Sequence, residues 1–176
     1  MPTYVPIETY TVPSLTTSVT LGSGNTLSQA YTHLRVVISD CSSTGPDANI
    51  QCRFNADSNS VYSFTNTGAR SLSATPYGNR VANTNYAYLQ SFTAVGSGYV
   101  GGLQCDIPRY STSGVNKAWL SNSRTGPGSA TYSGIELLIG FWRNTSAITQ
   151  LTFTLNSGGN FTVGSVFTVY GIKAGA

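Results

Sequence analysis

The sequence has few charged residues for its length. Asp, Glu, Lys and Arg make up 9% of the 176 residues, whereas they make up about 25% of an ordinary soluble domain. The formal net charge is +3, and the basic residues are scattered along the chain without forming a run. A protein that binds nucleic acid through its phosphates needs clustered basic side chains. The sequence therefore predicts no nucleic-acid partner.

Histidine and acidic residues, which supply most catalytic acids and bases, are also scarce. His33 is the single histidine and lies in the strand-like segment YTHLRVV, where we expect it to have a structural role. A glycosidase needs two carboxylates about 5–10 Å apart, but none of the six acidic residues forms a local pair in the sequence. We therefore predict no catalytic residues, no enzymatic activity and no cofactor.

Three cysteines occur, at positions Cys41, Cys52 and Cys105. An odd number without Cys-x-x-Cys spacing argues against a disulfide framework, and with a single histidine the sequence has no zinc-site pattern. We expect reduced, half-buried thiols and no metal. One disulfide between two of the three cysteines is left open by the sequence.

No segment of the sequence has the pattern of an export signal or a membrane span. Residues 1–20 lack the basic start and apolar core of a secretory signal. The longest apolar run lies around Ile135–Trp142 and is far too short to cross a bilayer. We therefore expect a chain that is made in a cytoplasm and has no membrane partner.

Short strand-like segments are present throughout the sequence, and helical periodicity is nearly absent. Clusters of Gly, Asn, Ser and Pro separate these segments, which is typical of an antiparallel sandwich or barrel. We predict an all-β fold, a single antiparallel jelly-roll β-sandwich of about ten strands over residues 16–176, after an extended N-terminal arm over residues 1–15. Residues 65–85 are polar and are predicted to form a long loop. The predicted strands are 16–21, 32–39, 50–55, 61–64, 87–94, 99–106, 117–121, 134–142, 149–155 and 165–172.

Two of the predicted strands are apolar on both faces. Segment 134–142 has Ile135, Leu137, Ile139 and Phe141 on one face and Leu138 and Trp142 on the other; segment 165–172 has Phe167 and Val169 opposite Val166, Tyr170 and Ile172. A two-layer sandwich needs one apolar face per sheet, so the second face must be covered by the 65–85 loop or by another subunit. We place a protein–protein interface on these strands and on the N-terminal arm, at Tyr4, Val5, Ile7, Tyr10, Leu138, Trp142, Phe167 and Val169.

The segment FNADSNSVYSF, residues 54–64, resembles a small metal-binding loop at first sight. Asn55, Asp57 and Asn59 stand at alternate positions, as oxygen ligands of a calcium ion do. However, a calcium loop of the EF-hand type needs a following Glu and flanking helices, and strand-like segments flank this loop. We therefore interpret it as an Asx turn that connects a hairpin.

Two parts of the chain resemble a known family. The segment YTHLRVVIS, followed by IQCRFNADSNSVYSF, resembles the N-terminal half of jelly-roll structural proteins of tailed bacteriophages. In that family a Tyr-Thr-His-Leu strand precedes a segment that ends in Phe-Asn-Gly-Asp and then Asn-Tyr-Ser. This chain has Ala56 at the Gly position and Val61-Tyr62-Ser63 in place of Asn-Tyr-Ser. The segment AITQLTFTLNSGGNFTVGSVFTVYGIK is similar to the C-terminal hairpin of the family, whereas residues 65–130 have no such likeness.

The resemblance implies a non-enzymatic virion structural protein. The first expectation is a capsid decoration or cement protein, made in the host cytoplasm, that binds the major capsid protein on the capsid exterior. Such a protein is expected to be a homotrimer. The alternative is a tail or fibre module that binds host-surface glycans, with Tyr77, Tyr86, Tyr88, Tyr99 and Tyr110 stacking on sugars. A major capsid protein would need a basic arm, which the N-terminal MPTYVPIETYTVP is not.

Overall fold

The computed structural model describes residues 4–24, 26–45, 48–70, 73–90, 94–95, 101–125, 134–156 and 158–173. Every regular element within these ranges is a strand. The strands are β1 (Tyr4–Thr11), β2 (Ser18–Leu21), β3 (His33–Ser43), β4 (Ile50–Phe54), β5 (Tyr62–Arg70), β6 (Ser73–Thr84), β7 (Ala87–Gln90), β8 (Ala94–Val95), β9 (Gly101–Pro108), β10 (Lys117–Thr125), β11 (Gly134–Trp142), β12 (Leu151–Leu155) and β13 (Val166–Ile172).

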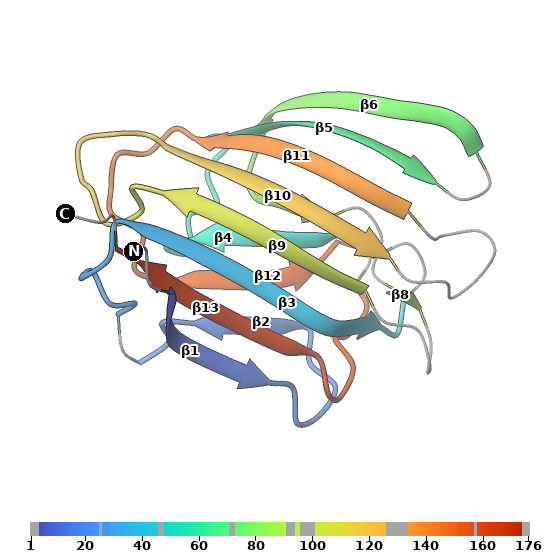
Figure 1. Ribbon diagram of the computed structural model, residues 1–176, viewed down its shortest axis with the longest axis horizontal. Coiled ribbons are helices and arrows are strands. Elements are labelled where there is room, and N and C mark those ends of the chain that lie inside the picture. Colours follow the sequence, from blue (N-terminus) through green and yellow to red (C-terminus); the bar gives the residue numbers. More distant parts are fainter. Residues whose placement is uncertain are drawn as a thin grey trace.

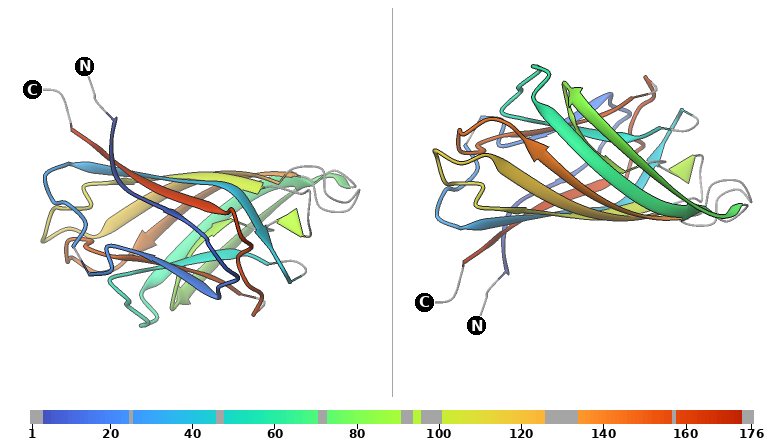
Figure 2. Two further views of the ribbon diagram at one scale, coloured as in Figure 1. Left: turned by 90° about the horizontal axis from the view of Figure 1, so that it is seen from below. Right: turned by 90° about the horizontal axis from the view of Figure 1, so that it is seen from above.

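The strands form two sheets that pack face to face. The large sheet has the order β1-β13-β3-β9-β10-β11-β5-β6, with β8 beside β3, and the small sheet has the order β2-β12-β4-β7. Figure 1 shows the large sheet in front of the small one, and Figure 2 shows the two sheets as separate layers. The predicted all-β sandwich is confirmed.

The pairing of eight strands explains how the sequence wraps around the core. The antiparallel pairs β1–β13 and β3–β9 lie in the large sheet, and the antiparallel pairs β2–β12 and β4–β7 lie in the small sheet. These four pairs, taken from β1–β13 through β2–β12 and β3–β9 to β4–β7, follow one another like the rungs of one long hairpin, and they lie alternately in the large and the small sheet. This is the scheme expected of a jelly roll. Two hairpins are inserted into this scheme, β5–β6 between β4 and β7 and β10–β11 between β9 and β12, and both widen the large sheet.

Three expectations about the chain path differ from the structure. The predicted 65–85 loop is wrong, because most of it forms β5 and β6, which pair from Tyr62↔Thr84 to Arg70↔Ser73. Segment 54–64 is not a hairpin connection, since β4 lies in the small sheet and β5 in the large sheet. Most of the expected N-terminal arm is β1, the edge strand beside β13. The predicted strand over residues 134–142 coincides with β11, and the other predicted strands overlap observed ones.

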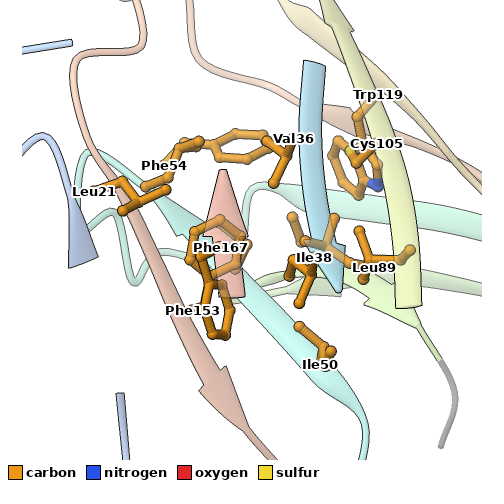
Figure 3. Close-up of a cluster of buried hydrophobic side chains, with 14 of the residues drawn as sticks. Leu21, Val36, Ile38, Ile50, Phe54, Leu89, Cys105, Trp119, Phe153 and Phe167 are labelled. Carbon is orange, nitrogen blue, oxygen red and sulfur yellow. The ribbon is translucent and has the colours of Figure 1, made fainter. Parts of the chain in front are cut away.

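The core fills the space between the two sheets. Inward side chains alternate with outward ones along β9 and β12, as the period of a strand requires. Figure 3 shows Phe54, Trp119, Phe153 and Phe167 within this core. The Phe54 ring meets the rings of Trp119 and Trp142 edge-on, with centroids 5.6 Å and 5.5 Å away, a geometry that stabilises aromatic pairs beyond their burial.

Gly140 on β11 makes room for this aromatic cluster. A Cβ atom at position 140 would overlap the indole ring of Trp119, which is 1% exposed. The two residues face each other in the register of β10 and β11. The absence of a side chain at Gly140 therefore lets Trp119 lie flat across the neighbouring strand.

Candidate functional site

The outward face of β11 is an uncovered row of apolar side chains. Burial alternates along the strand, and every second residue points away from the core. Ile135 is 69% exposed, Leu137 50%, Ile139 47% and Phe141 50%. Leu120 of β10, which is 45% exposed, pairs with Ile139. These five residues form what we call the apolar stripe.

The neighbours of the apolar stripe across the sheet are small or polar. The four β11 residues of the stripe pair with Ser63, Thr65, Thr67 and Ala69 on β5. On β10 they pair with Leu120, which belongs to the stripe, and with Ala118, Asn122 and Arg124. Among the outward side chains that the structure describes on β5, β10 and β11, Arg124 is the only charged one. Apart from Arg124, the stripe is therefore flanked on β5 and β10 by side chains too short to cover it, and its neighbours on these strands carry little charge.

Two alternatives were given for covering a second apolar face, the 65–85 loop and another subunit, and the first of them is wrong. The 65–85 segment was expected to fold over the second apolar face, but β5 and β6 continue the same sheet beside β11. Figure 1 shows them side by side with β11 rather than in front of it. Cover by another subunit stays a prediction.

A hollow in the outward face adjoins the apolar stripe. It has a volume of about 650 Å³ and lies at the Ile135 end of β11, across β3, β9, β10, β5 and β6. Ile135 and Leu137 belong to both the stripe and the hollow. The other outward-facing residues that line it are Val37, Ser39, Thr67, Ala69, Pro76, Gly102, Gln104, Asn122 and Arg124. The hollow is therefore lined by apolar and polar residues together, and Ile135 and Leu137 lie on its β11 side.

The two interface residues predicted on β11 lie on its other face. Leu138 is 1% exposed and Trp142 is 0% exposed, so neither side chain is available to a second subunit and this prediction is corrected. The Trp142 ring stacks on Tyr62 with centroids 6.2 Å apart, and its indole N–H donates to the carboxylate of Asp57 at 2.9 Å. The aromatic cluster thus holds this face of β11 against the small sheet.

The two interface residues predicted on β13 are also part of the core. Phe167 and Val169 are both 0% exposed, and the prediction is corrected for them too. The Phe167 ring lies 5.3 Å from that of Phe153 and 5.1 Å from that of Phe161, measured between centroids. Figure 3 shows Phe167 and Phe153 together in the core.

The predicted interface residues on β1 lie at the edge of the large sheet. Tyr4 is 47% exposed and Tyr10 is 38% exposed, and Val5 and Ile7 are half-buried. β1 pairs with β13 on one side and ends the order of the sheet. These four residues are accessible in part, and their role in an interface stays a prediction.

Arg35 ties the start of β1 to the outward face. Its guanidinium lies 4.9 Å from the centroid of the Tyr4 ring and donates to the Tyr4 hydroxyl at 2.8 Å. It also makes a two-point contact with the Asp106 carboxylate, at 2.6 Å and 2.9 Å. The hydrogen bond to Asp106 raises the pKa of Arg35 above its ordinary value, although burial opposes the charge. The paired charges lie beside Leu120, which faces Asp106, and they neutralise each other there.

The turn interpretation of residues 55–59 is confirmed. The backbone N–H of Asn59 donates to the Asp57 carboxylate at 3.0 Å, which closes an Asx turn. Asn55 has a φ of 54° and Ala56 a φ of 56°, and the Asn55 side-chain oxygen accepts the Thr149 N–H at 2.8 Å. These polar side chains stabilise the segment that passes from β4 in the small sheet to β5 in the large sheet. Within the described ranges, no group of three or more His, Cys, Asp or Glu side chains could hold a metal ion.

The tyrosines proposed for glycan binding have other surroundings in the structure. Tyr110 is 0% exposed, and its hydroxyl donates to the Ser28 carbonyl. Tyr88 is 8% exposed and stacks on Phe64 with centroids 4.7 Å apart. Neither ring is available to a sugar. Tyr77 and Tyr86 are half-buried, and the fifth, Tyr99, is outside the described residues.

The three cysteines are unpaired and fully buried rather than half-buried. Burial raises the pKa of Cys41 to about 12, and it also raises the pKa of Cys52 and of Cys105. Such thiols behave as small apolar side chains. His33, on the strand expected for it, places Nδ1 2.8 Å from the Thr32 hydroxyl.

Comparison with known proteins adds no relative. No protein-family model, no curated protein and no solved structure matches the chain. Over the part of the chain that the structure describes, there is no helix of the length and hydrophobicity that crossing a membrane requires. The support for a function therefore comes from the outward face of the large sheet and from the resemblance in sequence.

Proposed function

We propose that this chain is a bacteriophage virion structural protein, a decoration or cement protein that binds the outer capsid surface and stabilises the head. Its partners are the major capsid protein and further copies of the same chain. The observation that carries the proposal is the apolar stripe, because an uncovered apolar sheet face with little charge is typical of a surface that meets another protein. The sequence resemblance supports the virion as the place of that contact.

The arrangement of the strands fits a role in binding rather than in catalysis. The hairpin β10–β11, which bears the stripe, is inserted into the eight-strand scheme without disturbing its pairing. Function is commonly carried by such additions to a rigid scaffold. The core that supports the hairpin includes Trp119, Trp142 and Leu138, so the outward face is held by well-packed side chains.

Stabilisation of a head by such a protein follows from repetition. A single copy contributes a few contacts with its neighbours, but many symmetric copies on one particle act together. Once one contact of a copy has formed, its other contacts form at a high effective concentration. A weakly charged, Ser-, Thr- and Asn-rich surface suits such a lattice, because neighbouring copies do not repel each other strongly. The homotrimer expected of a decoration protein is proposed as an assembly formed on the capsid, whereas the contact inferred below concerns the free chain in solution.

The N-terminal strand is the proposed capsid contact. Tyr4 and Tyr10 are its exposed aromatic residues. Deletion of residues 1–13 would remove all of β1 and the buried Val12, so it would disturb the fold as well as the contact. Point substitutions at the two tyrosines are therefore the sharper test.

The experiment measures rebinding to particles that lack the protein. Purified wild-type chain, a Tyr4→Ala/Tyr10→Ala variant and a Val163→Ala control are added to such capsids, and occupancy is read by quantitative gel or cryo-electron microscopy. Val163 is exposed in a loop outside β1, so its truncation removes exposed apolar surface elsewhere on the molecule. We expect wild type and control to saturate the particles and the tyrosine variant to bind at least about tenfold more weakly. If the wild-type chain leaves capsids bare, the proposed function is wrong.

A further inference from the structure

We propose that the apolar stripe is the contact between two copies of this chain, packed sheet to sheet about a two-fold axis that lies between the sheets and runs across β11. The inference rests on the proposed function in one respect, that the protein acts as an assembly of copies. It names the occupant of the outward face as a second copy, and the capsid contact stays with β1.

The size of the stripe matches the apolar part of a standard interface. Five aliphatic or aromatic side chains between 45% and 69% exposed present on the order of 400–500 Å² of apolar surface. A standard interface buries about 800 Å² on each partner, of which a little over half is apolar. The Thr, Ser and Asn residues paired with the stripe supply the remaining polar part.

The hollow determines the direction in which the two sheets pack. If the two β11 strands ran parallel, each hollow would face the other hollow and leave a void between the copies. In the antiparallel arrangement, Phe141 of one copy lies over Ile135 of the other, and Leu137 lies over Ile139. The Phe141 ring, which is 50% exposed, then enters the partner's hollow beside Ile135 and Leu137. Interfaces without such voids are the stable ones.

The position of Arg124, the charged residue that pairs with a member of the stripe, agrees with the same arrangement. Arg80 lies one strand further away, on β6 beside Thr65. Arg124 lies at the hollow end of β10, beside Ile135. Antiparallel packing places it at the opposite end of the interface from the partner's Arg124 and next to the partner's Phe141, whose ring face attracts a cation. Arg143, beyond Phe141 at the β5 side, donates to the Ser60 carbonyl at 3.1 Å and to Asn83 at 2.8 Å. Its charge is therefore held at the rim of the interface.

The first test is the mass of the purified chain in solution, by sedimentation equilibrium from about 1 to 100 µM. We expect twice the 18.6 kDa chain mass for wild type and for Val163→Asp, a control that puts a charge on an exposed apolar site in a loop off this face. Leu137→Asp should raise the dimer dissociation constant at least about 100-fold, because it buries an unpaired carboxylate. A monomeric wild type, a trimer unaffected by Leu137→Asp, or a dimer that Val163→Asp disrupts equally would overturn the proposal.

A second test reads the direction of packing. A mixture of Ile135→Cys and Phe141→Cys chains should give a covalent dimer with a short bismaleimide, because the two positions face each other across the axis, whereas Ile135→Cys alone should not. Efficient linking of Ile135→Cys to itself would refute the antiparallel arrangement. The native cysteines are buried and unpaired and do not interfere. A monomeric chain that still coats capsids would refute this inference alone, and a dimer that does not bind capsids would refute the proposed function alone.

Discussion

Leu137 and Leu138 are adjacent residues of β11 on opposite faces, so truncating each to Ala tests which face belongs to the core. Leu138 is 1% exposed and Leu137 is 50% exposed. Removing a fully buried leucine side chain costs about 2–5 kcal/mol, since the lost burial and the cavity add. Leu137 lies between Thr67 and Asn122 on the outward face, and its truncation should change the free energy of unfolding of the monomer by less than about 0.5 kcal/mol.

The comparison is well controlled because both variants make the same chemical change in one strand. Differences in strand propensity and in the unfolded chain therefore nearly cancel. The measurement is urea unfolding followed by tryptophan fluorescence, at protein concentrations low enough that dilution no longer alters the midpoint, which separates folding from association. Equal losses of stability, or a larger loss for Leu137→Ala, would refute the assignment of the two faces.

Three further predictions concern the core, the crossing loop and the thiols. Gly140→Ala should cost about 3 kcal/mol, because its Cβ overlaps the Trp119 ring; an unchanged urea midpoint and unchanged near-UV circular dichroism would contradict this. At Asp57, burial disfavours the carboxylate, but hydrogen bonds including that from Trp142 outweigh it and lower the pKa below its ordinary value of 3.8. The stability that this carboxylate contributes is therefore present above pH 3.8 and is lost as the pH falls through the lowered pKa. Asp57→Asn should flatten the acid side of a curve of stability against pH. An acid side identical to that of wild type would count against the loop geometry. Burial raises the pKa of Cys41 to about 12 and also raises the pKa of Cys52 and of Cys105, so none of the three thiols should react with a disulfide reagent at about pH 8 in the native chain. A rapid native reaction would show that a thiol is accessible.

The strands with alternating or continuous apolar residues were the predictable part of the fold. β11 follows from its apolar run, and β12 follows from the alternation of Leu151, Phe153 and Leu155 with threonines. Most of β5 and all of β6 were missed, because this hairpin extends the large sheet at its edge and the outward residues of β5 are Ser, Thr and Ala. A polar sequence of this kind has the composition of a loop, and its pairing with β11 is decided by tertiary structure.

The sequence indicated an uncovered apolar face but not which one. On β11, Ile135, Leu137, Ile139 and Phe141 form the more uniformly apolar face, and a preference for burying apolar surface assigns that face to the core. The structure buries the opposite face, which includes Gly140 and Glu136. Gly140 is compatible with the core because Trp119 fills its place, and the Glu136 carboxylate accepts a hydrogen bond from the Asn66 amide. Both arrangements depend on neighbouring strands, so the pattern of a single strand does not contain them.

The number of copies of this chain per purified virion, measured by quantitative mass spectrometry against the major capsid protein, tests the proposed function most directly. A decoration protein repeats with the capsid lattice, so we expect a copy number comparable to that of the major capsid protein. A copy number of only a few per cent of the capsid protein would place the chain at the tail or at a unique vertex, and its absence from virions would contradict the account altogether.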